Sequence, residues 1–410
     1  MNNAQQYYQS LINQGHLPEH ALHYTQMYYP GFHPVQISGT QLPVYVQMPV
    51  IPQRKSRTTL YVILGIGVFA IIVVMLILGA IFAFAFFEFE DRTPEFGFRH
   101  DVESSLFENL AANQEPYMGS DYPNFSSVVY IEGTSSDGEI YAGSGVIISE
   151  KWVLTAAHVV DGLKASSTSV FLGVDYQNAQ VSIPIEGYEI HPGYSSSDEL
   201  LEEGFDIALI ELTDSVDSSS VSIANWDNRT SIDGLELGVK VYTSGYGDYN
   251  RDYSKCTDYC LTDGDSYHSQ RRAWENTLDR IVVDLQSSNN FEGDSEYKGG
   301  WVVYDFDSPR GDSNALGQGE SFSFEQGDYS YAGAGDSEST ALPLEGTSVM
   351  GDSGGPTFAL IGSSWTVIGL TSHGSESANY GDVAFNTGVY SHRSWICSHS
   401  GINNPIQGCS

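Results

Sequence analysis

The stretch Gly351-Asp-Ser353-Gly-Gly-Pro356 places a single serine among glycines late in the sequence. Glycine tolerates positive φ and lets the backbone approach a ligand closely, so this loop can expose Ser353 and the N–H groups beside it. A serine hydroxyl is a weak nucleophile that needs an adjacent base, and that base needs a group to orient it. A glycine-rich loop with one serine is usually only a turn, so its meaning depends on what accompanies it.

Two earlier stretches supply the missing roles. Trp152-Val-Leu-Thr-Ala-Ala-His158 leads from an apolar strand through small residues to one histidine. Phe205-Asp206-Ile-Ala-Leu-Ile-Glu-Leu212 places a carboxylate at the start of a strongly apolar strand. A histidine beside alanines is usually a core or surface residue, and an aspartate before a strand is usually a turn residue. Together with Ser353, however, His158 and Asp206 form a set of nucleophile, base and orienting group.

The sequence from Pro123 onward consists of short β-type runs broken by Gly, Asp and Ser. Many short strands without long amphipathic helices indicate an all-β sandwich or barrel. The runs are Ser127–Ile131, Gly145–Ile148, Val181–Ile185, Ile207–Leu212, Val239–Thr243, Trp301–Tyr304 and Thr366–Thr371.

In their order along the chain, the His158, Asp206 and Ser353 stretches resemble the three signature stretches of trypsin/chymotrypsin-like serine proteases. Three further stretches are similar to that family: His191-Pro192-Gly-Tyr194, Thr243-Ser-Gly-Tyr-Gly247 and Gly388-Val-Tyr390 followed by Trp395-Ile396. The resemblance spans about residues 117–396. It implies an all-β fold, a double antiparallel β-barrel of chymotrypsin type, with the active site between the barrels.

The resemblance also implies a catalytic triad and a reaction. Ser353 would be the nucleophile, His158 the general base and then acid, and Asp206 the group that holds the imidazole tautomer. The backbone N–H groups of Gly351 and Ser353 would form the oxyanion hole. The expected activity is that of a serine endopeptidase, which hydrolyses peptide bonds through an acyl-enzyme. The alternative from another class is a catalytically silent, surface-displayed peptide-binding module on the same fold.

The substrate-binding residues implied by the resemblance begin at Thr347, the floor of the specificity pocket, followed by Ser348. Trypsin-like enzymes have an aspartate at the floor to receive Lys or Arg, so Thr347 argues against basic-residue specificity. Ser372-His373-Gly374 resembles the edge segment that pairs with an extended substrate. Gly374 and Gly388 indicate an open pocket for a neutral, apolar or aromatic side chain. Acceptance of an acidic side chain by His373 is the alternative.

One departure from the family concerns activation. No basic cleavage site followed by Ile-Val-Gly-Gly is present, although Tyr117-Met118-Gly119 lies where the mature N-terminus would begin. The resemblance implies that a newly cut amine pairs with the aspartate before the nucleophile, here Asp352. Either Asp352 has another partner, or a different protease cuts near residue 117.

The charge of the chain is strongly acidic, with 52 Asp and Glu against 17 Lys and Arg and a formal net charge of −35. Such a chain is repelled by phosphate backbones, which argues against nucleic-acid binding.

The charge of residues 1–58 differs from that of the rest of the chain, because they hold one acid and three bases. The 28 residues of Leu60–Phe87 carry no charge. As a helix they would span roughly 42 Å, more than the ~30 Å core of a bilayer.

We therefore expect a single transmembrane helix at residues 59–87 in a cell membrane. The basic flank places residues 1–58 in the cytoplasm and the protease domain outside the cytoplasm. The expected divisions are a cytoplasmic tail with a Pro-rich linker (1–58), the membrane helix (59–87), an acidic stalk (88–122), a protease domain (123–400) with an insertion at about 248–344, and a C-terminal tail (401–410).

Residues 1–30 read as a short helical hairpin, either a weakly ordered tail or a docking site for a cytoplasmic partner. A third functional hypothesis makes the chain an adaptor that works through this hairpin.

All four cysteines lie after residue 88, at Cys256, Cys260, Cys397 and Cys409. An even number in an oxidising compartment suggests two disulfides. Three pairings are possible for four cysteines, and we favour the local ones, Cys256–Cys260 and Cys397–Cys409.

No cofactor and no catalytic metal are expected. Asp305, Asp307 and Asp312 offer oxygen ligands that suit Ca²⁺. The alternative for these three residues is a solvated acidic loop.

Overall fold

A computed structural model gives the arrangement of the chain in two compact units, Met1–Glu88 and Phe89–Ser410. In the second unit the structure describes residues 97–179, 181–196, 203–229, 234–247, 270–287, 297–317, 323–324, 327–328, 332, 337–374, 378–401 and 404–409. In the first unit it describes only a few residues between 4 and 33. The predicted membrane helix at 59–87 and the Cys256–Cys260 pair lie outside the described residues.

Most of the regular secondary structure in the described part of the second unit is β-strand. The helices are α4 (Ser104–Ala111), α5 (Ala157–Val160) and α7 (Arg393–Ser398), with 3₁₀ turns η1 (Phe125–Ser127), η2 (Ala165–Ser167) and η6 (Val389–His392). The strands are β1 (Val128–Thr134), β2 (Ile140–Ser149), β3 (Trp152–Thr155), β4 (Ser169–Leu172), β5 (Val181–Ile190), β6 (Ala208–Leu212), β7 (Asn225–Trp226), β8 (Lys240–Gly245), β9 (Arg272–Thr277), β10 (Arg280–Leu285), β11 (Gly299–Asp305), β12 (Ser323–Phe324), β13 (Gly327–Asp328), β14 (Pro356–Ile361), β15 (Ser364–Gly374) and β16 (Val383–Gly388).

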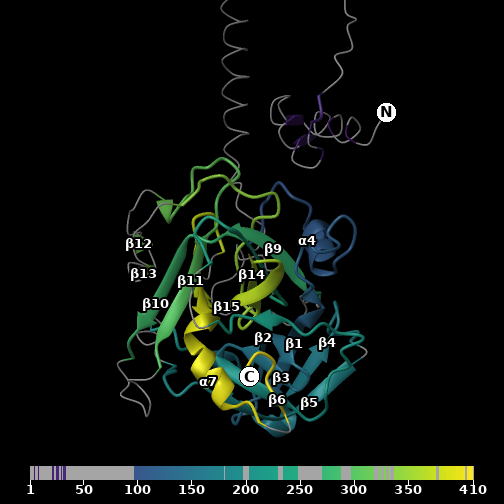
Figure 1. Ribbon diagram of the computed structural model, residues 1–410, viewed down its shortest axis with the longest axis vertical. Helices are drawn as coiled ribbons and strands as arrows, with labels where there is room; N and C mark the ends of the chain where they lie inside the picture. The colour runs from purple at the N-terminus through teal and green to yellow at the C-terminus, as the bar shows by residue number, and fades with distance from the viewer. Residues whose placement is uncertain are drawn as a thin grey trace, which may run out of the picture. The chain divides into compact units, whose positions relative to one another are not determined.

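The first six strands close into a barrel in the order β1-β2-β3-β6-β5-β4. Every pairing in it is antiparallel, and the barrel occupies the lower part of Figure 1. Along its strands, apolar side chains either alternate with polar ones or follow one another without interruption, because side chains must fill the interior of the barrel. The interior cluster includes Val129, Ile147, Val153 and Ile210, all fully buried.

The later strands form an eight-stranded sheet in the order β10-β11-β16-β15-β14-β8-β9, with β7 added beside β15. Seven of these strands run antiparallel to their neighbours, and β7 runs parallel to β15. The expected all-β architecture is therefore confirmed, with one closed six-stranded barrel and a second curved layer in the position of the second barrel. The β12–β13 pair forms a separate two-stranded sheet.

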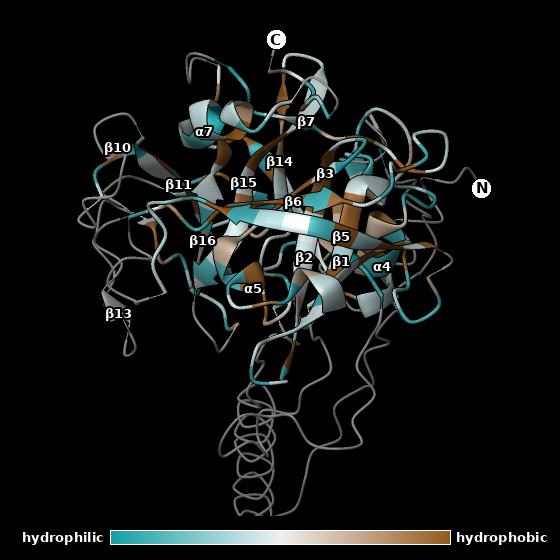
Figure 2. Cartoon of the chain, turned by 90° about the horizontal axis from the view of Figure 1, so that it is seen from below, coloured by the Kyte–Doolittle hydropathy of each residue, from teal (hydrophilic) through white to brown (hydrophobic). Residues whose placement is uncertain are grey.

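The largest apolar cluster joins the two layers. It combines Val146 and Leu154 of the barrel with Tyr242, Phe358 and Leu370 of the second sheet. In Figure 2 much of β3, β14 and β15 is coloured brown, for hydrophobic residues, whereas many turns are teal. A shared core of this kind fixes the two layers against each other, which matters because each supplies part of the candidate site.

Residues 97–122 correct the prediction of an acidic stalk. α4 packs on β9, and Phe107 and Leu110 are fully buried in the shared core. Arg271 donates from Nη2 to the carbonyl of Ala111 at 3.0 Å, and Arg272 pairs with Glu108 at 3.1 Å. The acids of this segment face solvent or basic partners, while Phe98, Phe107, Leu110, Ala111 and Tyr117 are buried, so this stretch is part of the second compact unit.

The predicted insertion at about 248–344 also needs correction. β9, β10 and β11 fall inside it, and all three are strands of the second sheet. Their β-type pattern is weaker than that of the flanking strands because of charged residues such as Arg272 and Arg280, which the fold buries.

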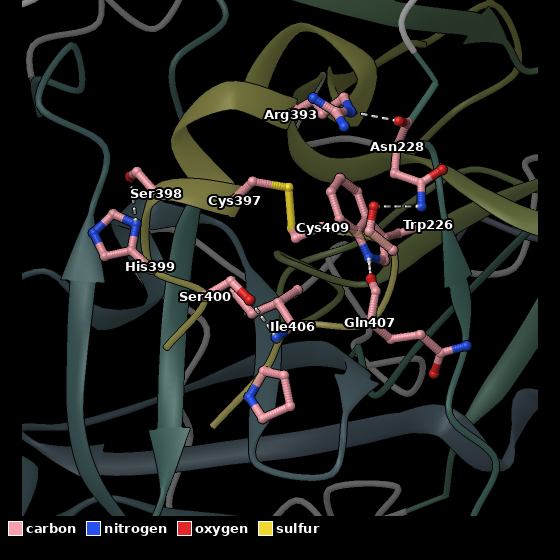
Figure 3. The surroundings of a disulfide bond; sticks show 12 residues. Trp226, Asn228, Arg393, Cys397, Ser398, His399, Ser400, Ile406, Gln407 and Cys409 are labelled. Atoms are coloured by element: carbon pink, nitrogen blue, oxygen red, sulfur yellow. Dashed lines mark hydrogen bonds between the residues drawn. A yellow bond between two sulfur atoms is a disulfide. The ribbon is translucent and has the colours of Figure 1, made fainter. Parts of the chain in front are cut away.

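The C-terminal tail is held by the rest of the unit. Cys397 and Cys409 form a disulfide, as predicted, and Trp226 donates from Nε1 to the carbonyl of Gln407 at 2.6 Å (Figure 3). The tail also crosses the first barrel, where Trp152 Nε1 donates to the carbonyl of Asn404 at 3.0 Å. Ser149 Oγ of β2 donates to the carbonyl of Pro405 at 2.6 Å. The last described residues thus contact both layers.

In the first unit Ala4, Tyr8, Ala21, Leu22, Thr25 and Gln26 have helical backbone. The Tyr8 and Phe32 rings lie 5.6 Å apart, and Thr25 Oγ1 donates to the carbonyl of Ala21 at 2.6 Å. No helix within the described ranges of either unit is long and apolar enough to cross a membrane.

Candidate active site

His158 and Asp206 are brought together by two paired strands of the first barrel. β3 ends at Thr155 and leads into the one-turn helix α5, which carries His158. Thr155 pairs with Ala208 at the start of β6, so Asp206 lies just beside the entry to that helix. The Asp206 side chain is fully buried, whereas about a third of the His158 side chain is exposed.

Three hydrogen bonds hold the Asp206 carboxylate. His158 Nδ1 lies 2.7 Å from Oδ2, and the His158 backbone N–H donates to Oδ1 at 3.0 Å. Ser372 Oγ on β15 donates to Oδ2 at 2.5 Å. Bonds to an ionised acceptor are stronger than neutral ones, so the imidazole ring is fixed with Nδ1–H toward the carboxylate. This leaves Nε2 of His158 free of the pair, as a general base requires.

The two groups shift each other's protonation. Burial alone would lower the pKa of His158, but the charge and hydrogen bond of Asp206 outweigh it and raise the pKa above its ordinary value. Burial alone would raise the pKa of Asp206, but His158, together with the Ser372 and backbone hydrogen bonds, lowers it. Asp206 is therefore a carboxylate throughout the neutral range, and its field stabilises an imidazolium on His158.

Ser353 comes from the second layer and is seated against the first. Its carbonyl accepts from the Ser144 N–H at 2.8 Å. Gly354, at φ 80°, lies so close to Thr155 and Ser144 that a Cβ there would collide with both, and it would come within 2.9 Å of the Ala156 nitrogen. Glycine is thus required for the loop to reach the residues that precede His158. The structure brings the neighbourhoods of all three predicted triad residues together.

The loop that holds the predicted oxyanion-hole residue Gly351 is fixed by Asp352. The Asp352 carboxylate is completely buried and accepts from the Gly247 N–H at 2.8 Å and from the Val349 N–H at 2.9 Å. Ser144 Oγ donates to the Gly351 carbonyl at 2.9 Å, which orients the peptide between Gly351 and Asp352. A Cβ on Gly247 would lie 2.5 Å from an Asp352 oxygen, so this glycine makes room for the carboxylate.

The predicted substrate-binding residues lie on two segments of the second layer. Thr347 is buried and Ser348 is partly exposed. Ser372, His373 and Gly374 end β15, and Gly388 ends β16. A Cβ on Gly374 would lie 2.9 Å from the Val383 carbonyl, and one on Gly388 would lie 3.3 Å from Gly300. In these two positions, glycine permits close approach of neighbouring strands.

His373 is enclosed by aromatic rings. Its ring is parallel to Phe385 at 4.8 Å and edge-on to Trp301 at 5.0 Å. Burial, opposed by the charge of Asp206 and assisted by that of His158, lowers the pKa of His373 to about 4. His373 is therefore neutral near pH 7.

Sequence reasoning assigned Ser372 to substrate pairing and missed its bond to Asp206. It also missed Ser144, whose backbone and side chain both contact the Gly351–Ser353 loop. Both contacts join residues more than 160 positions apart. The small-residue run around Ser144, Ala142-Gly-Ser-Gly145, was the available signal.

Two of the three aspartates predicted as a calcium site accept hydrogen bonds from groups of the same chain. Asp305 accepts from the Leu316 N–H at 2.8 Å, and Asp312 accepts from Ser308 Oγ. Burial, together with the charges of neighbouring acids, raises the pKa of Asp307 to about 9. Among the described residues, no group of three or more His, Cys, Asp or Glu side chains is placed to hold a metal ion. The calcium site stays a prediction.

Part of the chain is similar to known proteins. Residues 117–295 match the family model described as Trypsin. The chain is 30% identical over 149 residues to human complement C1r subcomponent-like protein, a match covering 34% of this chain and 29% of that protein. It is 41% identical over 81 residues to mouse complement C1s-1 subcomponent, covering 18% and 11%.

The chain therefore spans less than a third of the length of these curated relatives. A solved structure titled as HL collagenase matches with a TM-score of 0.42 and 17% identity, over 67% of this chain and 93% of that one. The match of residues 117–295 to the Trypsin model, together with the closed barrel and the second sheet, supports a trypsin/chymotrypsin-like serine protease fold for this part of the chain.

Proposed function

We propose that the chain is a serine endopeptidase whose catalytic residues are Ser353, His158 and Asp206. The observation that carries the proposal is the fully buried Asp206 carboxylate bonded to His158 Nδ1 at 2.7 Å. A buried carboxylate in this position fixes the tautomer whose Nε2 takes a proton from a serine hydroxyl. A chain that only bound peptides would have no need of an ionised group buried for this purpose.

In the proposed reaction, Ser353 Oγ attacks the scissile carbonyl carbon as His158 Nε2 removes the hydroxyl proton. The resulting oxyanion is stabilised by the N–H groups of Gly351 and Ser353. The tetrahedral intermediate collapses as His158 returns the proton to the leaving amine, which leaves an acyl ester on Ser353. Water, deprotonated by His158, then hydrolyses the ester by the same steps in reverse.

We propose that the side chain accepted by the pocket is neutral and apolar or aromatic. Thr347 offers no charge to a Lys or Arg side chain. The neutral state of His373 near pH 7 removes the cation that an acidic side chain would require. Digestion of a peptide library by the full chain tests this proposal, and cleavage concentrated after Lys, Arg, Asp or Glu would contradict it.

We also propose that residues 59–87 anchor the enzyme in a cell membrane with the protease unit outside the cytoplasm. Support comes from the uncharged length of Leu60–Phe87 and from the basic residues that precede it. The test is alkaline carbonate extraction of membranes from cells expressing the full chain. Release of the wild-type chain into the soluble fraction would contradict the anchor.

The activity itself is tested by reaction of the full chain with a labelled fluorophosphonate, which modifies an activated serine. We expect the wild type to be labelled, and Ser353→Ala and His158→Ala to remain unlabelled. A wild type that stays unlabelled both intact and after limited proteolysis would favour the silent peptide-binding module instead.

A further inference from the structure

The segment that precedes α4 lies directly against the predicted floor of the specificity pocket. The Gly97 carbonyl accepts from the Thr347 N–H at 2.7 Å, and Phe98 forms an antiparallel bridge with Gly346. Gly97 has φ 80°, and a Cβ on it would lie 2.6 Å from the Thr347 carbonyl oxygen. We call residues 97–111 the strap, because they join this loop to the far edge of the second sheet.

The strap is also fixed by apolar contacts with β9 and by a hydrogen bond to residue 342. The Phe98 side chain is 3% exposed, with its ring 4.1 Å from Phe107 of α4 and 6.0 Å from Trp274 of β9. Arg99 donates from Nη1 to the Leu342 carbonyl at 2.8 Å. Because α4 is itself packed on β9, residues 342–347 are tied to the body of the sheet through the strap.

The loop that the strap holds runs on to the catalytic serine. Two residues after Thr347, the Val349 N–H donates to Asp352 Oδ2 at 2.9 Å, and the Asp352 N–H donates back to the Val349 carbonyl at 3.0 Å. Asn276 Nδ2 of β9 donates to the Gly346 carbonyl at 3.0 Å, a second tie to the sheet. The positions of Gly351 and Ser353 thus depend on a loop whose start is bonded to Gly97.

This arrangement exists in the uncut chain. Asp352 accepts hydrogen bonds from two backbone N–H groups of the same chain, those of Gly247 and Val349. The region where a mature N-terminus would begin is held elsewhere. Asn113 Nδ2 donates to the Pro123 carbonyl at 2.8 Å, and Trp365 Nε1 on β15 donates to the Ser120 carbonyl at 3.0 Å.

We propose that the strap acts as a built-in positioning element, so that the enzyme is active without cleavage near residue 117. In this proposal, which rests on the proposed endopeptidase function, Gly97 and Phe98 are positioning residues. They order the Thr347–Ser353 loop, so that the pocket floor and the oxyanion-hole donors are in place before any cut. Separation of the strap from residues 346–347 lowers kcat more than it changes KM.

The first test is fluorophosphonate labelling of the full chain, with mass measurement and N-terminal sequencing of the labelled species. We expect the uncut chain to be labelled to the same extent as a sample nicked at the exposed residues 114–116. Labelling only of the nicked sample would overturn this inference and leave the endopeptidase proposal standing. Labelling of neither would overturn both.

The second test compares Gly97→Ala with Gly119→Ala in the full chain. Both glycines have positive φ, 80° and 87°, so both substitutions carry similar backbone strain. Only at Gly97 does the new methyl group meet the Thr347 carbonyl, because nothing lies within 4 Å of it at Gly119. We expect Gly97→Ala to lower kcat roughly 10- to 100-fold, as small misplacements of catalytic groups do, and Gly119→Ala to leave kcat within about threefold.

A readout independent of activity is hydrogen exchange in a Ser353→Ala background. Gly97→Ala should speed exchange in peptides covering residues 345–352, while peptides from β3 and β6 keep their protection. Gly119→Ala should change neither. Equal exchange at 345–352 in both variants, or equal kcat, would overturn the role of the strap. If Gly97→Ala does not fold, the labelling of the uncut wild type still decides whether cleavage is needed.

Discussion

The glycine at position 247 is the sharpest test of how the catalytic loop is held. Replacing it with alanine adds one methyl group whose carbon would lie 2.5 Å from an oxygen and 2.6 Å from Cγ of Asp352. Ordinary contacts of this kind are 3.4 Å or longer. Because Gly247 does not have positive φ, the substitution adds no backbone strain, and the carboxylate must move by about 0.9 Å.

The expected loss of kcat follows from the hydrogen bonds that this movement of the carboxylate would break. The two N–H donors to Asp352 are at 2.8 and 2.9 Å, so such a shift takes at least one beyond hydrogen-bonding range. Loss of a hydrogen bond to a charged group costs about 1.5–3 kcal/mol. We expect the buried carboxylate to keep these hydrogen bonds by moving together with the Gly351–Ser353 loop. Misplacing one oxyanion donor lowers kcat by about 10²–10³.

The assay is steady-state hydrolysis of a chromogenic peptide substrate, with active enzyme counted by fluorophosphonate titration. We expect Gly247→Ala to lose kcat while its KM stays within about threefold, since the pocket floor is not altered directly. Gly187→Ala in β5 is the matched control, because nothing lies within 4 Å of a Cβ there. A folded Gly247→Ala enzyme with wild-type kcat would refute the idea that Asp352 positions this loop.

Three further expectations concern protonation and covalent linkage. kcat/KM should fall with decreasing pH through a pKa above 6.5, because neutral His158 is the proposed base. Asp206→Asn should lower that pKa and reduce kcat by about 10⁴. An unchanged pKa on the acidic side of the variant's pH profile would contradict the assignment. Burial lowers the pKa of His392 to about 4. Its contribution to the free energy of unfolding is therefore present above pH 6.5 and lost toward pH 4, by about 3 kcal/mol, so urea unfolding of His392→Gln should show a shallower pH dependence in this range. The Cys397–Cys409 disulfide closes a loop of sequence separation 12, so replacing both cysteines with alanine should cost about 3 kcal/mol of stability, and an unchanged melting temperature would argue against it.

The part of the site that could be predicted from sequence is the part that local chemistry dictates. His158 follows small residues at the end of a strand, and Asp206 begins another. Ser353 needs glycines beside it, and Gly354 is the position where the close approach to Thr155 leaves no room for a side chain. Each of these requirements is visible in the residue types within a few positions of the functional group.

What could not be predicted depends on contacts between distant segments. Composition alone made residues 88–122 read as an acidic stalk; in the described part of it, residues 97–122, five acids outnumber a single arginine. The helical spacing of Phe107, Leu110 and Ala111 was the opposing signal, and burial of that face decided the outcome. Nothing near Ser372 in sequence indicates that its hydroxyl donates to a carboxylate 166 residues away.

The bonds of the C-terminal tail have a consequence for anyone who alters the end of this protein. Trp152, six positions before His158, donates to the carbonyl of Asn404, and the tail is tied to the other layer through Gln407 and Cys409. A shortened tail, or a fusion partner that pulls it away, would remove a support from the strand that leads to the catalytic histidine. Residues 404–409 are therefore a poor place to attach an affinity tag or a reporter, although they lie about 50 residues from the proposed nucleophile Ser353 in sequence.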